Sequence, residues 1–405
     1  MRRKKRWTII ALALLGSWGL LEGEQIDPRY ATNRNCEACH TAISKQWQTS
    51  RHAHSHFTKN DLYDKTLDYI VAHELTKTKE EIVVECAKCH NPRIEKRSIN
   101  SADKLGLLLD IDKKSLDRIL ETPTMKNGIN CIVCHNVDKI HLDKKGGKRG
   151  FDAVEFGPQG IMYGPFEGAV SPYHKTQKRE FFVKDPNRLC FVCHYSDTND
   201  FGVEVYSTGK EYEAAKAEHP NAPQCIECHM SGKKKGIASN FGGEGGRVKR
   251  LVRDHLFASI DNSKIYEKYL TISAKRQKDR LTVSITSQVP HKVPTGYGLR
   301  DLEIRVAFFG KDGKQISEQR KLYTAHWINE QGEETIPHLA RKKGLDNRLA
   351  PYADVAETFT IPNGTHLINY KVIYRQIDPK MDRRLGVRDP FFTNEYVLKN
   401  GVIEF

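Results

Sequence analysis

All ten cysteines of this 405-residue chain occur in pairs, and this pairing limits the fold more than any other feature. Each pair has the spacing C-x-x-C, and a histidine follows each pair directly. Two thiols at this spacing can form thioether bonds to the two vinyl groups of one porphyrin, while the next imidazole binds its iron. The five units are Cys36/Cys39/His40, Cys86/Cys89/His90, Cys131/Cys134/His135, Cys190/Cys193/His194 and Cys225/Cys228/His229.

Two other interpretations of the cysteine pairs fit less well. A single C-x-x-C is more often a zinc site or a redox pair, but a zinc site uses two pairs, and five pairs leave one over. A disulfide scaffold gives no reason for a histidine after every pair. We therefore predict five covalently bound haem c groups, each with one iron.

The N-terminal segment has the charge and length of a secretory signal. Five basic residues precede an apolar run from Trp7 to Leu21, which is shorter than the ~20 residues of a membrane span. Cleavage after Gly19 or Gly23 is compatible with the sequence, but there is no A-x-A site, so an uncleaved anchor stays open. We expect residues 1–23 to be a signal peptide or anchor. The protein is then periplasmic or extracellular, and membrane-associated if the leader is kept.

The basic composition does not indicate a nucleic-acid partner. The formal charge of +14 falls to +9 without the five basic residues of the leader. Ten ionised propionates from five haems would bring the mature protein close to neutrality. No repeated pattern of basic and aromatic residues accompanies the charge, so we expect no nucleic-acid binding.

The chain divides into two parts of different sequence texture. Residues 24–260 carry every cysteine, with short helical runs within 77–90 and 101–121 and loops at 144–150 and 232–247. Residues 264–405 carry none, and short runs of alternating apolar and polar residues are separated by turn signals. This pattern predicts a mainly α-helical and irregular multihaem cytochrome c domain followed by an all-β antiparallel sandwich domain.

The first part resembles the superfamily of multihaem cytochromes c that includes the tetrahaem cytochrome c of ammonia oxidation, hydroxylamine oxidoreductase and octahaem tetrathionate reductase. The resemblance is carried by "CEACHTAISKQWQTSRHAHS", "CAKCHNP", "GINCIVCHNV", "YGPFEGAVSPYH", "RLCFVCH", "CIECHM" and "RDHLF". The second part resembles a tail domain with a GHxxPTG element, written here "PHKVPTGYGLRDLEI" with Pro290 in place of the glycine. Five motifs match neither the four-haem nor the eight-haem members, and no C-x-x-C-K marks a catalytic haem.

Twelve histidines remain after the five motif histidines, enough for a second axial ligand on every iron. The resemblance implies His52 as one such ligand, with His54 and His56 as close rivals. It also implies ligands just before the fourth motif and just after the third and fifth. His291, beside the P-T-G turn, could reach a haem from the second part, while His326, His338 and His366 are expected to be surface or sandwich residues. The predicted second ligands are His52, His141, His174, His255 and His291.

Two imidazoles on an iron leave no open coordination site, so this ligand set indicates electron transfer and no catalytic residue. We expect a cytochrome of anaerobic or respiratory chains, with redox partners such as a quinol dehydrogenase or a terminal reductase. Two alternatives stay open. One is an oxidoreductase with a single open iron that acts on small nitrogen or sulfur compounds. The other is the subunit of an oligomer or cytochrome filament.

Overall fold

The computed structural model describes residues 32–74, 76–93, 99, 101–109, 120–143, 147–240 and 248–405. The predicted leader lies outside the described residues, as do parts of the predicted helical run at 101–121 and of the two predicted loops. Within the described ranges, no helix combines the length and the apolar character that a membrane span requires.

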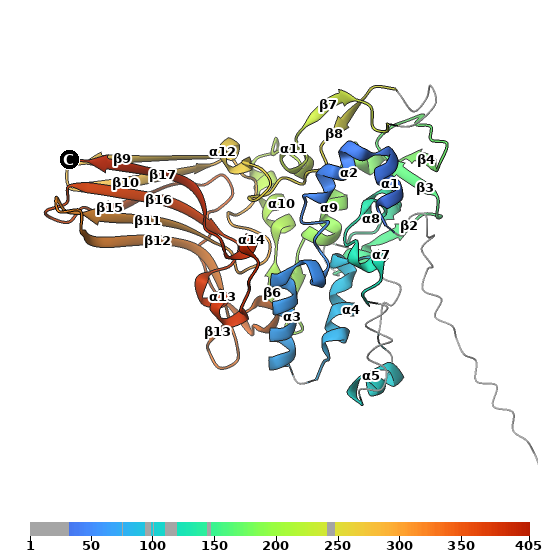
Figure 1. Cartoon of the computed structure of the whole chain (residues 1–405), viewed down its shortest axis with the longest axis horizontal. Coiled ribbons are helices and arrows are strands. Elements are labelled where there is room, and N and C mark those ends of the chain that lie inside the picture. Colours follow the sequence, from blue (N-terminus) through green and yellow to red (C-terminus); the bar gives the residue numbers. More distant parts are fainter. Residues whose placement is uncertain are drawn as a thin grey trace, which may run out of the picture.

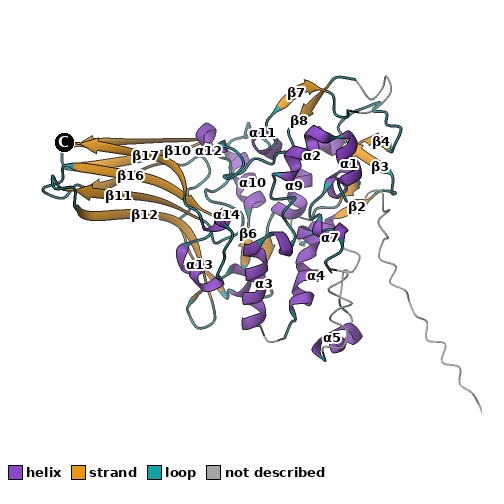
Figure 2. Cartoon of the chain, in the orientation of Figure 1, coloured by secondary structure: helices purple, strands orange, loops and turns teal. Residues whose placement is uncertain are grey.

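Helices gather in the N-terminal part of the molecule and long strands in the C-terminal part (Figures 1 and 2). Short paired strands connect the helices. The helices are α1 (Arg34–Cys39), α2 (Thr41–Gln48), α3 (Asp61–His73), α4 (Lys79–His90), α5 (Ser101–Leu108), α7 (Pro123–Lys126), α8 (Cys131–His135), α9 (Asn187–His194), α10 (Thr208–Glu218) and α11 (Cys225–His229). The paired strands are β1 (Val137–Ile140) with β2 (Val154–Phe156), β3 (Ile161–Gly164) with β4 (Lys175–Lys178), β5 (Asp197–Thr198) with β6 (Glu204–Tyr206), and β7 (Lys233–Gly236) with β8 (Arg250–Arg253).

Every cysteine motif lies at the end of a helix. The motif histidine is the last residue of α4, α8, α9 and α11, and it directly follows α1. The longest of these helices begins with a capping box, in which Thr78 accepts from the Glu81 N–H and the Glu81 side chain accepts from the Thr78 N–H. One turn of helix places both thiols and the imidazole on neighbouring positions of the same short segment.

The C-terminal part contains two antiparallel sheets. A three-stranded sheet has the order β15-β10-β9, and a six-stranded sheet has the order β13-β12-β11-β16-β17, with β14 paired to β12. The strands are β9 (Leu270–Gln277), β10 (Arg280–Ser287), β11 (Asp301–Phe309), β12 (Gln315–Ile328), β13 (Glu334–Thr335), β14 (Lys342–Asp346), β15 (Asp354–Thr360), β16 (Leu367–Arg375) and β17 (Tyr396–Glu404). Three short helices accompany them, α12 (Ile265–Tyr269), α13 (Pro379–Leu385) and α14 (Pro390–Thr393).

The two sheets share one hydrophobic cluster. Alternate residues of β10, namely Leu281, Val283 and Ile285, are fully buried, as the sequence alternation predicts. They belong to the same cluster as Ile304 on β11 and Val372 on β16. The two sheets therefore bury their apolar faces against each other.

A second cluster joins the helical part to the strand part. Leu67 on α3 and Val83 on α4 lie in one core cluster with Ile336, Ile377 and Met381 from the C-terminal part. Figure 1 shows α13 beside α3, and the two helices are in contact. The two parts are thus held together by a common hydrophobic core.

One predicted loop needs correction. Residues 232–247 were expected to be a loop because glycine and lysine dominate them, but Lys233–Gly236 forms β7 and pairs with β8. Backbone hydrogen bonds form this pair, while the side chains of Lys233, Lys234 and Lys235 stay exposed. A solvated strand of this kind lacks the apolar alternation by which a strand is recognised in a sequence, so the sequence predicted a loop instead.

Candidate haem-binding site

One connected cavity contains the cysteine motifs. It has a volume of about 2000 Å³, and its lining includes all ten cysteines and all five motif histidines. An ordinary pocket for a single small molecule measures ~300–1,000 Å³. The cysteines form no disulfides with one another. The cavity is therefore large enough, and carries the thiols in the right places, for several porphyrins.

Backbone carbonyls orient four of the five motif histidines. The Nδ1 atom of His40 lies 2.8 Å from the Ala238 oxygen, and that of His135 lies 2.8 Å from the Tyr163 oxygen. His229 makes the same contact with the Ala258 oxygen at 2.8 Å, and His90 with the Ser55 oxygen at 3.1 Å. A carbonyl acceptor at Nδ1 places the proton on that nitrogen, so Nε2 keeps its lone pair for a metal.

Four motif histidines face a second histidine across the cavity. An iron bound by two imidazoles would separate their ring centroids by ~6.2 Å, from two bonds of ~2.0 Å and two nitrogen-to-centroid distances of ~1.1 Å. The observed separations of centroids run from 6.1 to 6.4 Å. The four pairs are His40 with His174, His52 with His194, His135 with His255, and His229 with His291.

The histidines that face the motif histidines in these pairs, His52, His174, His255 and His291, are also in the neutral form. Nδ1 of His174, His255 and His291 lies 3.2, 3.1 and 2.9 Å from a backbone carbonyl oxygen. Burial lowers the pKa of His52 to about 3 and the pKa of His255 and His291 to about 4. At neutral pH these imidazoles are uncharged, the form that binds iron.

His90 differs from the other four motif histidines. Among the described residues, it has no histidine partner at the separation found in the four pairs. The ring of Tyr63 stacks on His90 at 4.2 Å between centroids, which is too close for a porphyrin between them. Tyr297 and His338 line the same cavity, and Nδ1 of His338 lies 3.5 Å from the Tyr297 hydroxyl.

His338 was expected to be a surface or sandwich residue, and this expectation is corrected. Its ring lines the cavity, where burial and the nearby His90 lower its pKa to about 4. The residue lies in a short 3-10 helix, Pro337–Leu339, that reaches the helical part from the C-terminal part. Nothing in the surrounding sequence distinguishes it from a lone structural histidine.

His141 is the one predicted second ligand that the fold does not bring to the cavity. Its side chain is 52% exposed, and Nε2 lies 3.3 Å from Glu155 Oε2. The residue follows the short strand β1, whose pairing with β2 directs it toward solvent beside Glu155. The rivals of His52 are elsewhere too: both ring nitrogens of His56 contact protein oxygens, and His54 Nδ1 contacts the Ser50 oxygen.

Thiols of different motifs are direct neighbours in three places. Cys36 of the first motif contacts Cys131 of the third, and this contact lowers the pKa of Cys36 and raises that of Cys131. Cys193 of the fourth motif contacts Cys89 of the second, and Cys225 of the fifth contacts Cys190 of the fourth. These contacts join the attachment points into two groups, the first with the third motif, and the second, fourth and fifth motifs together.

This fold and this arrangement of thiols and imidazoles resemble those of multihaem c-type cytochromes. Residues 35–136 match the family model described as cytochrome c554 and c-prime. A penta-heme cytochrome c552 from Thermochromatium tepidum has a similar structure, with a TM-score of 0.70 and 17% sequence identity over 92% of this chain and 98% of that chain. No curated protein matches the sequence.

The residues present fit haem c. Each motif brings two free thiols to the cavity, and each motif histidine lines it. Four such histidines face a neutral imidazole at the distance that one iron would bridge. Since all eight of these histidines line one cavity, the geometry matches the cofactor that the motifs require.

Proposed function

We propose that the protein is a pentahaem c-type cytochrome that transfers electrons outside the cytoplasm. When bound, the haems supply reversible one-electron transfer. The observation that carries the proposal is the set of four histidine pairs separated by 6.1 to 6.4 Å. Each pair would occupy both axial positions of one iron, leaving no site for a substrate.

The protein's own residues hold and tune these positions. Carbonyl acceptors fix the orientation of the imidazoles, and burial keeps the imidazoles neutral and limits access of water. The neighbouring thiols of Cys36 and Cys131, of Cys89 and Cys193, and of Cys190 and Cys225 bring attachment points of different motifs close together. Short separations between cofactors are what electron exchange along one polypeptide requires.

The cellular setting is part of the proposal. The apolar leader with its basic N-terminus supports export to the periplasm or beyond, where covalent haem attachment and a redox partner such as a quinol dehydrogenase or terminal reductase would be found. Within the multihaem cytochromes, we place the chain near the hydroxylamine oxidoreductase and octahaem tetrathionate reductase group on its sequence fragments.

The test is a count of haem and of spin states on the exported protein. A pyridine haemochrome assay should return five haems per chain. Magnetic circular dichroism should show at least four of them as six-coordinate and low-spin. His174→Ala should convert one low-spin haem to high-spin, whereas the exposed control His141→Ala should change nothing. Fewer than four low-spin haems in the unmodified protein would contradict the proposed ligand pairs.

A second candidate function is supported by the different surroundings of His90. An iron held there would have the partly buried Tyr63, Tyr297 and His338 as neighbours, groups that can donate hydrogen bonds to a small bound molecule. A haem-based oxidoreductase acting on a small nitrogen or sulfur compound needs such an open iron. If carbon monoxide or nitrite binds one haem of the unmodified protein, the result supports the oxidoreductase. If such binding appears only in His338→Ala, His338 is a sixth ligand and the result supports electron transfer alone.

A further inference from the structure

The turn that carries His291 comes from the C-terminal part of the chain but faces a motif of the helical part. His291 lies between Pro290 and the segment 292–296, and its ring centroid is 6.4 Å from that of His229. Backbone hydrogen bonds of 3.0 Å in both directions join Val293 to Leu349 and fix one side of the turn. The other side depends on a side chain from the helical part.

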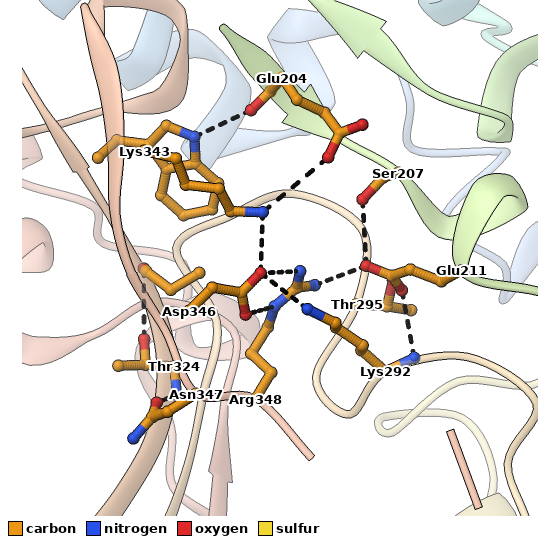
Figure 3. A network of polar contacts seen from close by, with 12 residues as sticks. Glu204, Ser207, Glu211, Lys292, Thr295, Thr324, Lys343, Asp346, Asn347 and Arg348 are labelled. Carbon is orange, nitrogen blue, oxygen red and sulfur yellow. Dashed lines mark hydrogen bonds and ion pairs between the residues drawn. The ribbon is translucent and has the colours of Figure 1, made fainter. Parts of the chain in front are cut away.

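That side chain is Glu211, on the first turn of α10. Its Oε2 accepts a hydrogen bond of 3.2 Å from the Lys292 N–H and one of 2.6 Å from the Thr295 hydroxyl. One carboxylate oxygen thus holds the residue that follows His291 and the residue at the end of the turn. Figure 3 shows Glu211 pointing toward both.

A buried arginine holds Glu211 in turn. Arg348 Nη1 lies 3.0 Å from Glu211 Oε1 and donates to the Pro294 oxygen at 3.2 Å. The other edge of the guanidinium donates two hydrogen bonds of 2.8 Å to the Asp346 carboxylate. Lys292 Nζ also lies 3.0 Å from Asp346 Oδ2, so the network closes on the turn it supports (Figure 3).

This network is better suited to fixing geometry than to adding stability. The side chains of Arg348 and Glu211 are only 8% and 7% exposed. Burying an ion pair at this depth costs desolvation free energy that the attraction barely repays. A fully hydrogen-bonded network of this kind instead restricts its members to one arrangement.

We propose that Glu211 is a positioning residue for the axial ligand His291. By holding Lys292 and Thr295, it keeps the imidazole aimed at the iron attached to the fifth motif. The proposal rests on the proposed function, which makes His291 an axial ligand. The helical part thereby controls a ligand supplied by the strand part.

The experiment measures how easily exogenous imidazole displaces the ligand in the ferric holoprotein. Glu211→Ala should raise the apparent affinity of one haem for imidazole on the order of 10–100-fold, the usual effect of losing a supporting partner of a metal ligand. Glu211→Gln keeps one oxygen that accepts from Lys292 and Thr295 but places an amide NH2 against Arg348, so its affinity for imidazole should lie between those of the unmodified protein and Glu211→Ala. Glu218→Gln, an exposed change on the same helix, is the matched control and should have no effect.

His291→Ala separates this inference from the proposed function. If His291→Ala leaves all low-spin signals intact, His291 is not a ligand and the ligand assignment fails. If His291→Ala produces one high-spin haem but Glu211→Ala leaves imidazole affinity unchanged, only the positioning role is refuted. Should Glu211→Ala fail to fold, Thr295→Val removes one of the same hydrogen bonds and must raise the affinity of the same haem, or the inference is overturned.

Discussion

The core shared by the two parts predicts that they unfold together. Leu67 on α3 has no exposed surface and lies in one cluster with Ile377 from the C-terminal part. Truncating such a leucine to alanine removes ~2.7–5.0 kcal/mol of stability. For 405 residues that unfold together, an unfolding entropy of ~2.1 cal/mol/K per residue gives ~1.2 °C per kcal/mol, so Leu67→Ala should lower the midpoint of thermal unfolding by roughly 3–6 °C.

The assay follows the holoprotein by two signals. The Soret band reports the haem-binding part, and a far-ultraviolet circular dichroism band of β structure reports the sheets. Leu67→Ala and Ile377→Ala should each shift both signals to the same lower temperature. Leu345→Ala, whose side chain is 55% exposed, is the control and should shift neither. The reasoning is refuted if Leu67→Ala lowers the Soret transition alone, since the sheets would then fold without the helical part.

Three further changes test local features. A Cβ at Gly150, where φ is +54°, would lie 1.9 Å from the Lys88 carbonyl oxygen. Gly150→Ala should therefore lower the haem content at the second motif, measured by haemochrome assay. The control Gly147→Ala, at φ +82° in open space, should leave the haem content unchanged. Burial alone would raise the pKa of Glu303, but two arginine hydrogen bonds bring it below 4.5; its ionised form therefore stabilises the fold above pH 4.5 and this stability is lost as pH falls. Glu303→Gln should cost ~1–3 kcal/mol at pH 7 in urea titrations and weaken the acid dependence, and equal costs at pH 7 and pH 3 would contradict this. His52→Ala should create one high-spin haem that binds carbon monoxide, and an unchanged absorption spectrum under carbon monoxide would remove His52 from the ligand set.

The motif helices and the second ligands differ in how far sequence could predict them. A C-x-x-C-H unit is local, since one helical turn places its three side chains, and the sequence therefore identified all five units. A second ligand depends on long-range packing instead. His174 and His255 were named through resemblance and do face a motif histidine, whereas His141 was named in the same way and points toward Glu155. His338 lines the cavity without any local signal.

The strand part was more predictable because its pattern is periodic. Alternation around Leu281, Val283 and Ile285 places these residues on one buried face of β10. The polar strand Lys233–Gly236 has no such alternation, and only its pairing with β8 makes it a strand. The supporting role of Glu211 was equally hidden, since it depends on a turn that follows it by many residues in the sequence.

The proposed histidine pairs also have a consequence for how the chain matures. Three of the four, His40 with His174, His52 with His194 and His135 with His255, connect distant points of the sequence. Each iron would act as a cross-link that closes a long loop and lowers the entropy of the unfolded chain, as a disulfide does. Because the loops interleave, a chain that emerges from its N-terminus would present His40 and His135 before His174 and His255 are available to pair with them. Haem attachment and folding would then be coupled. A chain without haem would lack the iron-mediated links between its N-terminal and C-terminal segments.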